Sequence, residues 1–319
     1  MHPRRQESTN SIGFLVNEEP VAVYGINLKS STENYVRGFD ASYWEYQEKL
    51  VLAIPKGAEN HDHLAFTKLT LSHALEHLFG LLCAYLQAPY CPDLWLYRYK
   101  PSDLPAMVGK LSRGEAILTP FKRNPASWSE VVATVWPYID ERRTELTAKI
   151  LTRLATELCS EQVRAEYNGI KHGLRLSMGG IAISFAPAAS PAEVPPPEKF
   201  ISLGDSKFGS RTWNFKQIGS SKRHLHATLA FSNWDYAELT TLLQHAVLLI
   251  GNMGPAMRKF LRIEGDDLFR YFSKDDAYTQ DPRTLSGLTT GKFVTEIDMP
   301  ENELMDLESI KKRYLNDAR

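Results

Sequence analysis

Four polar residues recur at the spacing of one helix face: Glu161, Arg164, Asn168 and His172. Steps of three and four residues place side chains in one line along an α-helix. In such a line the guanidinium of Arg164 can bind a phosphate, Asn168 can orient the bound group, and His172 titrates near neutral pH. The spacing therefore predicts acid–base chemistry on a phosphodiester, such as attack of a ribose 2′-hydroxyl on its own phosphate. The alternative is a solvated helix face whose C-terminal histidine favours the helix dipole.

The residues around this line, Glu166-Tyr167-Asn168-Gly169-Ile170-Lys171-His172-Gly173, resemble the motif helix of HEPN-like proteins. That family comprises small helical bundles from bacterial conflict systems and RNA metabolism, and many members are metal-independent ribonucleases that act as dimers. Their motif is an arginine, often a following asparagine, and a downstream histidine. Asn168 and His172 match its last two positions. Tyr167 stands where the arginine precedes the asparagine, and Arg164 is the nearest substitute.

This resemblance implies a protein that binds RNA or cleaves it without a metal ion or cofactor, in a bacterial defence or stress system. It also implies a homodimer that brings two copies of His172 together. In such an enzyme Arg164 would neutralise the phosphate, Asn168 would orient it, and His172 would act as general acid and base. The likeness extends from the helix that begins near His61 through Gly173.

A second chemical pattern is the sequence H-x-x-E-H formed by His73, Glu76 and His77. Histidines four residues apart share a helix face, so they could bind one zinc ion while the glutamate activates its water. The pattern, with the Leu-Phe-Gly that follows it, resembles the inverted zinc peptidases over about eight residues. A zinc hydrolase of that kind needs a distant third ligand, and the sequence does not distinguish between Glu145, Glu157 and Glu161. The alternative is a pair of histidines satisfied by hydrogen bonds to neighbouring helices.

A third interpretation is a non-catalytic interaction or ligand-sensing protein. Trp213 and Phe215 lie on one expected strand, and the basic run at 222–224 precedes the next. Basic and aromatic side chains together are typical of surfaces that bind single-stranded nucleic acid. An ordinary hairpin edge would show the same residues.

These residues need a framework, and the sequence predicts an α+β fold that is mainly α. Leucines at helical spacing predict a helix over 61–88. A second helical stretch over 127–158 must kink or divide at Pro137, and a break near Ser160 precedes the helix that ends at Gly173. A long helix is predicted over 234–261.

Strands are expected in a β-rich segment at about 176–232 and in short pieces near the N-terminus. The apolar runs at 21–24 and 50–54, which alternate with turn residues, are the reason for expecting strands near the N-terminus. We expect a disordered tail over 1–12, a mainly helical HEPN-like domain over 13–175, and a second part over 176–319. The second part would hold the β-rich module, the long helix and a C-terminal helix at 301–315, and both parts could pack as one unit.

Composition narrows the class of protein without naming an activity. The formal net charge of −1 over 319 residues gives no global basic field for nucleic acid, although local patches remain open. Three cysteines without a CxxC pair indicate reduced thiols rather than a disulfide framework. The N-terminus lacks an apolar leader segment, and no apolar run approaches the length of a membrane span. We therefore expect a cytoplasmic protein that does not bind membranes.

Overall fold

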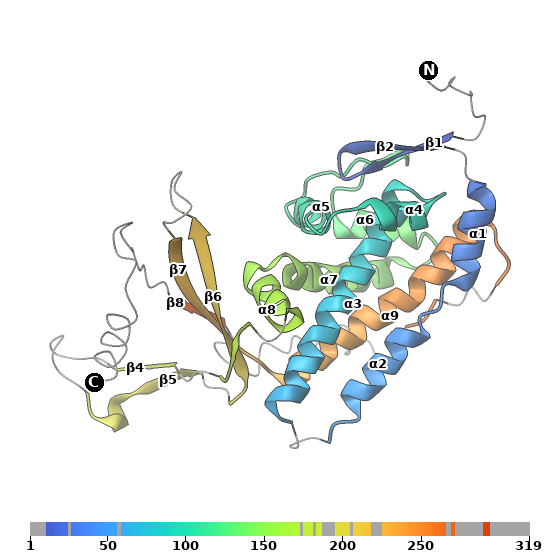
Figure 1. Cartoon of the computed structure of the whole chain (residues 1–319). Helices are drawn as coiled ribbons and strands as arrows, with labels where there is room; N and C mark the ends of the chain where they lie inside the picture. The colour runs from blue at the N-terminus through green and yellow to red at the C-terminus, as the bar shows by residue number, and fades with distance from the viewer. Residues whose placement is uncertain are drawn as a thin grey trace.

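The computed structural model describes residues 11–24, 27–55, 59–172, 175–180, 183–186, 195–204, 207–217, 225–265, 269–271 and 290–293. Within these residues helices dominate and the strands form small sheets, which confirms a mainly α, α+β fold. Helices gather on one side of the molecule and strands β3–β8 on the other (Figure 1).

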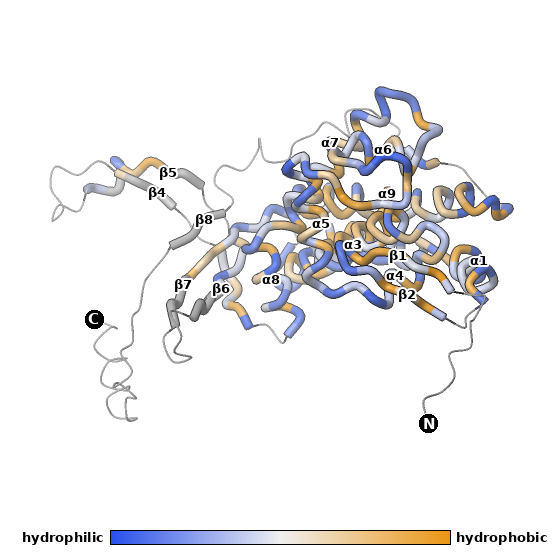
Figure 2. The backbone as a smooth tube through the Cα atoms, turned by 90° about the horizontal axis from the view of Figure 1, so that it is seen from above, coloured by the Kyte–Doolittle hydropathy of each residue, from blue (hydrophilic) through white to orange (hydrophobic). Residues whose placement is uncertain are grey.

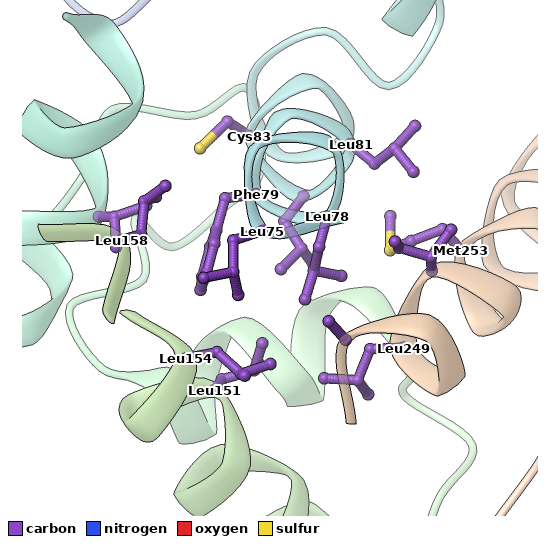
Figure 3. Close-up of a cluster of buried hydrophobic side chains, with 14 of the residues drawn as sticks. Leu75, Leu78, Phe79, Leu81, Cys83, Leu151, Leu154, Leu158, Leu249 and Met253 are labelled. Atoms are coloured by element: carbon purple, nitrogen blue, oxygen red, sulfur yellow. The ribbon is translucent and has the colours of Figure 1, made fainter. Parts of the chain in front are cut away.

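Two long helices, α3 (His61–Gln87) and α9 (Tyr236–Leu261), pack along each other at the centre of the helical part (Figure 1). Apolar residues of α3, α9 and α7 (Glu141–Cys159) meet in one buried cluster, which Figure 3 shows in close-up. Leu78 on α3, Leu154 on α7 and Leu249 on α9 are each at most 2% exposed. The leucine spacing that predicted the helix over 61–88 thus marks the face that faces this cluster.

Shorter helices surround this centre. They are α1 (Leu28–Gly38), α2 (Ser42–Leu52), α4 (Pro92–Arg98), α5 (Asp103–Ser112) and α6 (Trp128–Val135). By length and composition α3 is apolar enough to cross a membrane, but 78% of its apolar window is buried inside the protein. Figure 2 shows its hydrophobic tube enclosed by the other helices.

The predicted division at Pro137 is confirmed, because α6 ends at Val135 and α7 begins at Glu141. A side chain caps the N-terminus of each of these helices. The Ser127 hydroxyl accepts a hydrogen bond from the Glu130 N–H at 3.3 Å, and the Asp140 carboxylate accepts one from the Arg143 N–H at 2.8 Å.

The N-terminal expectation was right for the first strands and wrong beyond them. Strands β1 (Ser11–Val16) and β2 (Glu19–Tyr24) form an antiparallel hairpin that begins inside the predicted tail. The apolar run at 50–54 is no strand, because it lies in the end of α2 and the turn after it. Burial in α2 follows helical spacing, with Trp44 and Val51 seven residues apart and both buried.

The β-rich segment contains two antiparallel sheets. One has the order β3 (Ser177–Met178), β6 (Gly209–Gln217), β7 (Leu225–Asn233) and β8 (Thr290–Phe293). The other pairs β4 (Ile183–Phe185) with β5 (Ile201–Gly204), and a short 3₁₀ helix spans Pro197–Lys199. A Cβ atom at Gly209 would lie 2.3 Å from the Ser232 carbonyl oxygen, so β6 begins at a residue without a side chain.

The boundary predicted at 175–176 does not separate two cores. Strand β7 leads through Trp234 and Asp235 directly into α9, which packs in the helical core against α3. Elements of the two predicted parts therefore pack against each other in the helical core. The predicted C-terminal helix at 301–315 lies outside the described residues.

Candidate functional site

Helix α8 (Glu161–Lys171) carries the residues that the sequence singled out, and Ser160 fixes where it begins. The Ser160 N–H ends α7 by donating to the Thr156 carbonyl at 3.1 Å. Its hydroxyl then accepts a hydrogen bond from the Val163 N–H at 3.3 Å and caps α8. One residue thus closes one helix and opens the next, which explains the break in the apolar pattern at this point.

The polar line of α8 lies on its outer face, as the spacing predicted: Glu161, Arg164, Asn168 and His172 are all exposed. The other sides of the helix are covered, with Glu166, Tyr167 and Gly169 buried. His172 is the C-cap residue, and its N–H donates to the Asn168 carbonyl oxygen at 3.1 Å. Lys171 and Arg175 are exposed beside it, so this end of α8 presents a group of basic side chains.

One polar contact between α3 and α8 centres on Tyr167. The Tyr167 hydroxyl donates to a Glu76 carboxylate oxygen at 3.0 Å. The His73 ring stands edge to face against the Tyr167 ring, with centroids 5.2 Å apart and planes at 86°. The Lys171 ammonium lies 5.2 Å from the centroid of the same ring. We call these four residues the Tyr167 cluster.

Burial sets the protonation of this cluster. Partial burial of His73 lowers its pKa, and the nearby Lys171 ammonium lowers it further against the opposing effect of Glu76. His73 is therefore a neutral imidazole at neutral pH, able to accept a proton. Burial and the Glu76 carboxylate both raise the pKa of Tyr167, which keeps its hydroxyl protonated as a donor.

Arg164 lies on the same side of α8 as the Tyr167 cluster. A cavity of about 50 Å³ is bounded by Arg164, Tyr167 and Glu76, with apolar residues of α5 on its far wall. A space of this size holds one or two water molecules. Arg164 thus borders one small cavity together with Tyr167 and Glu76 of the Tyr167 cluster.

His77 belongs to a different contact from His73, although the two lie one turn apart on α3. Its ring stacks on Phe39 with centroids 6.3 Å apart and lies 5.5 Å from the Trp44 ring. Burial lowers the pKa of His77 to about 4. Since His73 faces α8 and Glu76 holds Tyr167, the three residues of the H-x-x-E-H pattern do not point at one centre. No group of three or more histidine, cysteine, aspartate or glutamate side chains among the described residues could hold a metal ion.

The sequence did not reveal a buried ion pair behind α8, between Lys68 and Glu166. The Lys68 ammonium lies 3.4 Å from Glu166, whose side chain is 0% exposed. Glu166 also accepts hydrogen bonds from the Ser210 hydroxyl and, at 3.2 Å, from the Trp234 indole. Burial lowers the pKa of Lys68, but the carboxylate of Glu166 and, more weakly, those of Glu157 and Glu238 outweigh it and raise the pKa.

One signal for this pair was available. Lys68 falls on the apolar line of α3 defined by Leu64, Leu71 and Leu75, where a charge needs a partner. The pair links α3, α8, β6 and the connection from β7 to α9, so it fixes the motif helix against both parts of the molecule.

A polar cavity of about 210 Å³ adjoins this pair between α3, α7, α8 and the start of α9. Arg153 forms ion pairs there with Glu238 and, at 3.6 Å, with Glu157. Burial raises the pKa of Glu238 despite the neighbouring Arg153. Arg153 and Lys68, the two cations that line the cavity, thus each face a carboxylate of the protein.

The basic and aromatic surface expected on the sheet is described only in part. Trp213 on β6 is 49% exposed. Residues 222–224 and the side chain of Phe215 lie outside the described part of the chain. Strand β6 contacts α8, where the Gln162 amide donates to the Thr212 hydroxyl at 3.4 Å.

Comparison of the chain with protein-family models, with curated proteins and with solved structures found no match.

Proposed function

We propose that the protein binds RNA and cleaves it without a metal ion, on the outer face of α8. The observation that carries this proposal is the exposure of Arg164, Asn168 and His172 in one line along this helix, with Lys171 beside His172 at its end. The likeness of this helix to the HEPN motif supports the choice of RNA as substrate.

Each side chain has a role that its chemistry suits. The planar guanidinium of Arg164 binds a phosphate through paired N–H donors, and Lys171 adds a second positive charge. The amide of Asn168 orients the bound backbone. His172 stands exposed at the C-terminal end of α8, and imidazole is the side chain that most often acts as general acid or base.

A homodimer fits this arrangement. One α8 offers a short line of contacts, whereas two copies related by a two-fold axis would offer a continuous surface to one RNA strand. Light scattering on the purified protein is expected to give twice the chain mass of 36.1 kDa. A monomer at the concentrations where RNA is bound would remove the dimer from the proposal.

The test of cleavage uses labelled single-stranded RNA in EDTA, with the wild-type protein and a His172→Ala variant. We expect products ending in a 2′,3′-cyclic phosphate, and a loss of at least 100-fold in rate for the variant. Lys149→Ala is the matched control, because Lys149 is an exposed cation on α7 that pairs with Glu145 at 2.8 Å. Absence of cleavage, or equal cleavage by wild type and His172→Ala, contradicts a catalytic role for α8. Binding without cleavage would leave an RNA-binding protein.

A further inference from the structure

We propose that His73 is a second catalytic residue of the α8 site, the general base that takes the proton of the attacking 2′-hydroxyl. The inference rests on the proposed function and assigns the two proton transfers to two histidines. His172 then acts as the general acid for the leaving group.

The Tyr167 cluster places His73 next to the motif helix. His73 and Lys171 both contact the Tyr167 ring, each at 5.2 Å from its centroid. Lys171 is in turn the chain neighbour of His172. In this proposal the phosphate lies at the Lys171 ammonium, with His73 on its α3 side and His172 at the end of α8.

The two histidines differ in environment in the way that this chemistry requires. His73 is partly buried between α3 and α8, and burial with the Lys171 ammonium lowers its pKa, so the imidazole is neutral. Glu76 and Lys171 are the charged groups that act on it, one from each helix. His172 is exposed at the C-terminus of α8, open to solvent and to a leaving group. The covered histidine therefore suits the base, and the exposed one suits the acid.

The two histidines account for both proton transfers of the cleavage reaction. The neutral His73 imidazole accepts the 2′-hydroxyl proton as the 2′-oxygen forms a bond to phosphorus. The bond from phosphorus to the 5′-oxygen breaks, and the His172 imidazolium gives its proton to that oxygen. The products are a 2′,3′-cyclic phosphate and a free 5′-hydroxyl, with Arg164 and Lys171 neutralising the extra charge on the phosphorus oxygens.

Tyr167 and Glu76 act as positioning residues in this scheme. Glu76 accepts the hydrogen bond of the Tyr167 hydroxyl, which fixes the ring against which His73 packs. This also explains why a tyrosine at the position of the family's arginine is compatible with catalysis. The tyrosine replaces a phosphate contact with a contact that holds a base.

The test compares His73→Gln with His77→Gln, two substitutions one turn apart on α3. We expect His73→Gln to lower the cleavage rate at least 100-fold while RNA affinity stays within about two-fold. The rising limb of the pH–rate profile, which reports the general base, should disappear. His77→Gln should cleave at the wild-type rate, because His77 packs against Phe39 and Trp44 rather than against α8.

A wild-type rate and pH profile in His73→Gln would overturn the inference, and loss of cleavage in His172→Ala would still leave the proposed function standing. Absence of cleavage by the wild type would overturn both. A second variant, Lys171→Gln, covers the case in which His73→Gln fails to fold. Since the Lys171 ammonium lowers the pKa of His73, its removal should move the rising limb to higher pH, and an unmoved limb contradicts the assignment.

Discussion

Helix α8 meets α3 in two places that differ in their access to water. Behind α8 the Lys68–Glu166 pair is closed, with a lysine 5% exposed and a glutamate 0% exposed. At its edge the Tyr167 cluster is only partly covered and continues into the exposed line of Arg164 and His172. Glu166 and Tyr167 are consecutive in the chain, so the direction of each side chain decides its role. The closed contact fixes the helix, and the open contact is where our proposal places the chemistry.

The largest effect on stability is expected from breaking the closed contact between Lys68 and Glu166. Glu166→Gln leaves the Lys68 ammonium buried without its counter-charge, and we expect the free energy of unfolding to fall by about 3–5 kcal/mol. The double variant Lys68→Met/Glu166→Gln should regain most of this loss, because no charge is then buried and the amide can still accept from Ser210 and Trp234. Urea denaturation followed by circular dichroism measures both.

The matched control for this pair is Glu145→Gln, which removes an exposed partner of Lys149. Its denaturation midpoint should equal that of the wild type, since exposed ion pairs contribute little. An unchanged midpoint in Glu166→Gln would show that Lys68 finds another counter-ion. The carboxylates of Glu157 and Glu238 are the nearest alternatives, by their effect on its pKa.

The sequence predicted the features of these helices that depend on local signals. The leucine spacing of α3, the proline between α6 and α7, and the polar line of α8 each lie within one segment, where periodicity and breakers act. Helices α1 and α2 were both missed, and α2 was missed because the apolar run at 50–54 suits a strand as well as a helix end. That ambiguity is inherent in short apolar runs.

Contacts between side chains that are far apart in the chain could not be predicted from the sequence. Tyr167 and Glu76 lie 91 residues apart, and nothing local indicates that their helices cross where these residues stand. The same holds for Lys68 and Glu166, although a lysine on an apolar line signalled that some partner existed. The H-x-x-E-H pattern misleads for a related reason, because His73 and His77 share a helix face but contact different neighbours.

The difference between these two histidines gives a second prediction, on the pH dependence of stability. His77 has a folded-state pKa of about 4, below its ordinary value of 6.5, so the unfolded chain binds its proton first. Its contribution is complete above pH 6.5 and is lost as the pH falls toward 4. The loss amounts to about 3 kcal/mol over that range.

Urea denaturation between pH 7.5 and 4 measures this loss when wild type is compared with His77→Phe. The phenyl ring keeps the packing against Phe39 and Trp44 and removes the titrating group. We expect the difference in stability between the two proteins to grow in favour of the variant as the pH falls. A constant difference would show that water reaches the His77 ring in the folded protein, which would make it as open as His73.

The smallest effect is expected at the open contact itself. Tyr167→Phe removes the hydroxyl that donates to Glu76 and keeps the ring that packs on His73. We expect a loss of about 0.5–1.5 kcal/mol in the free energy of unfolding, because water can replace the donor at a partly exposed carboxylate. Glu76→Gln should cost a similar amount, and the double variant should cost less than the sum of the two. Additive losses would mean that the hydrogen bond contributes nothing to the cluster, and His73 would then owe its position to ring packing alone.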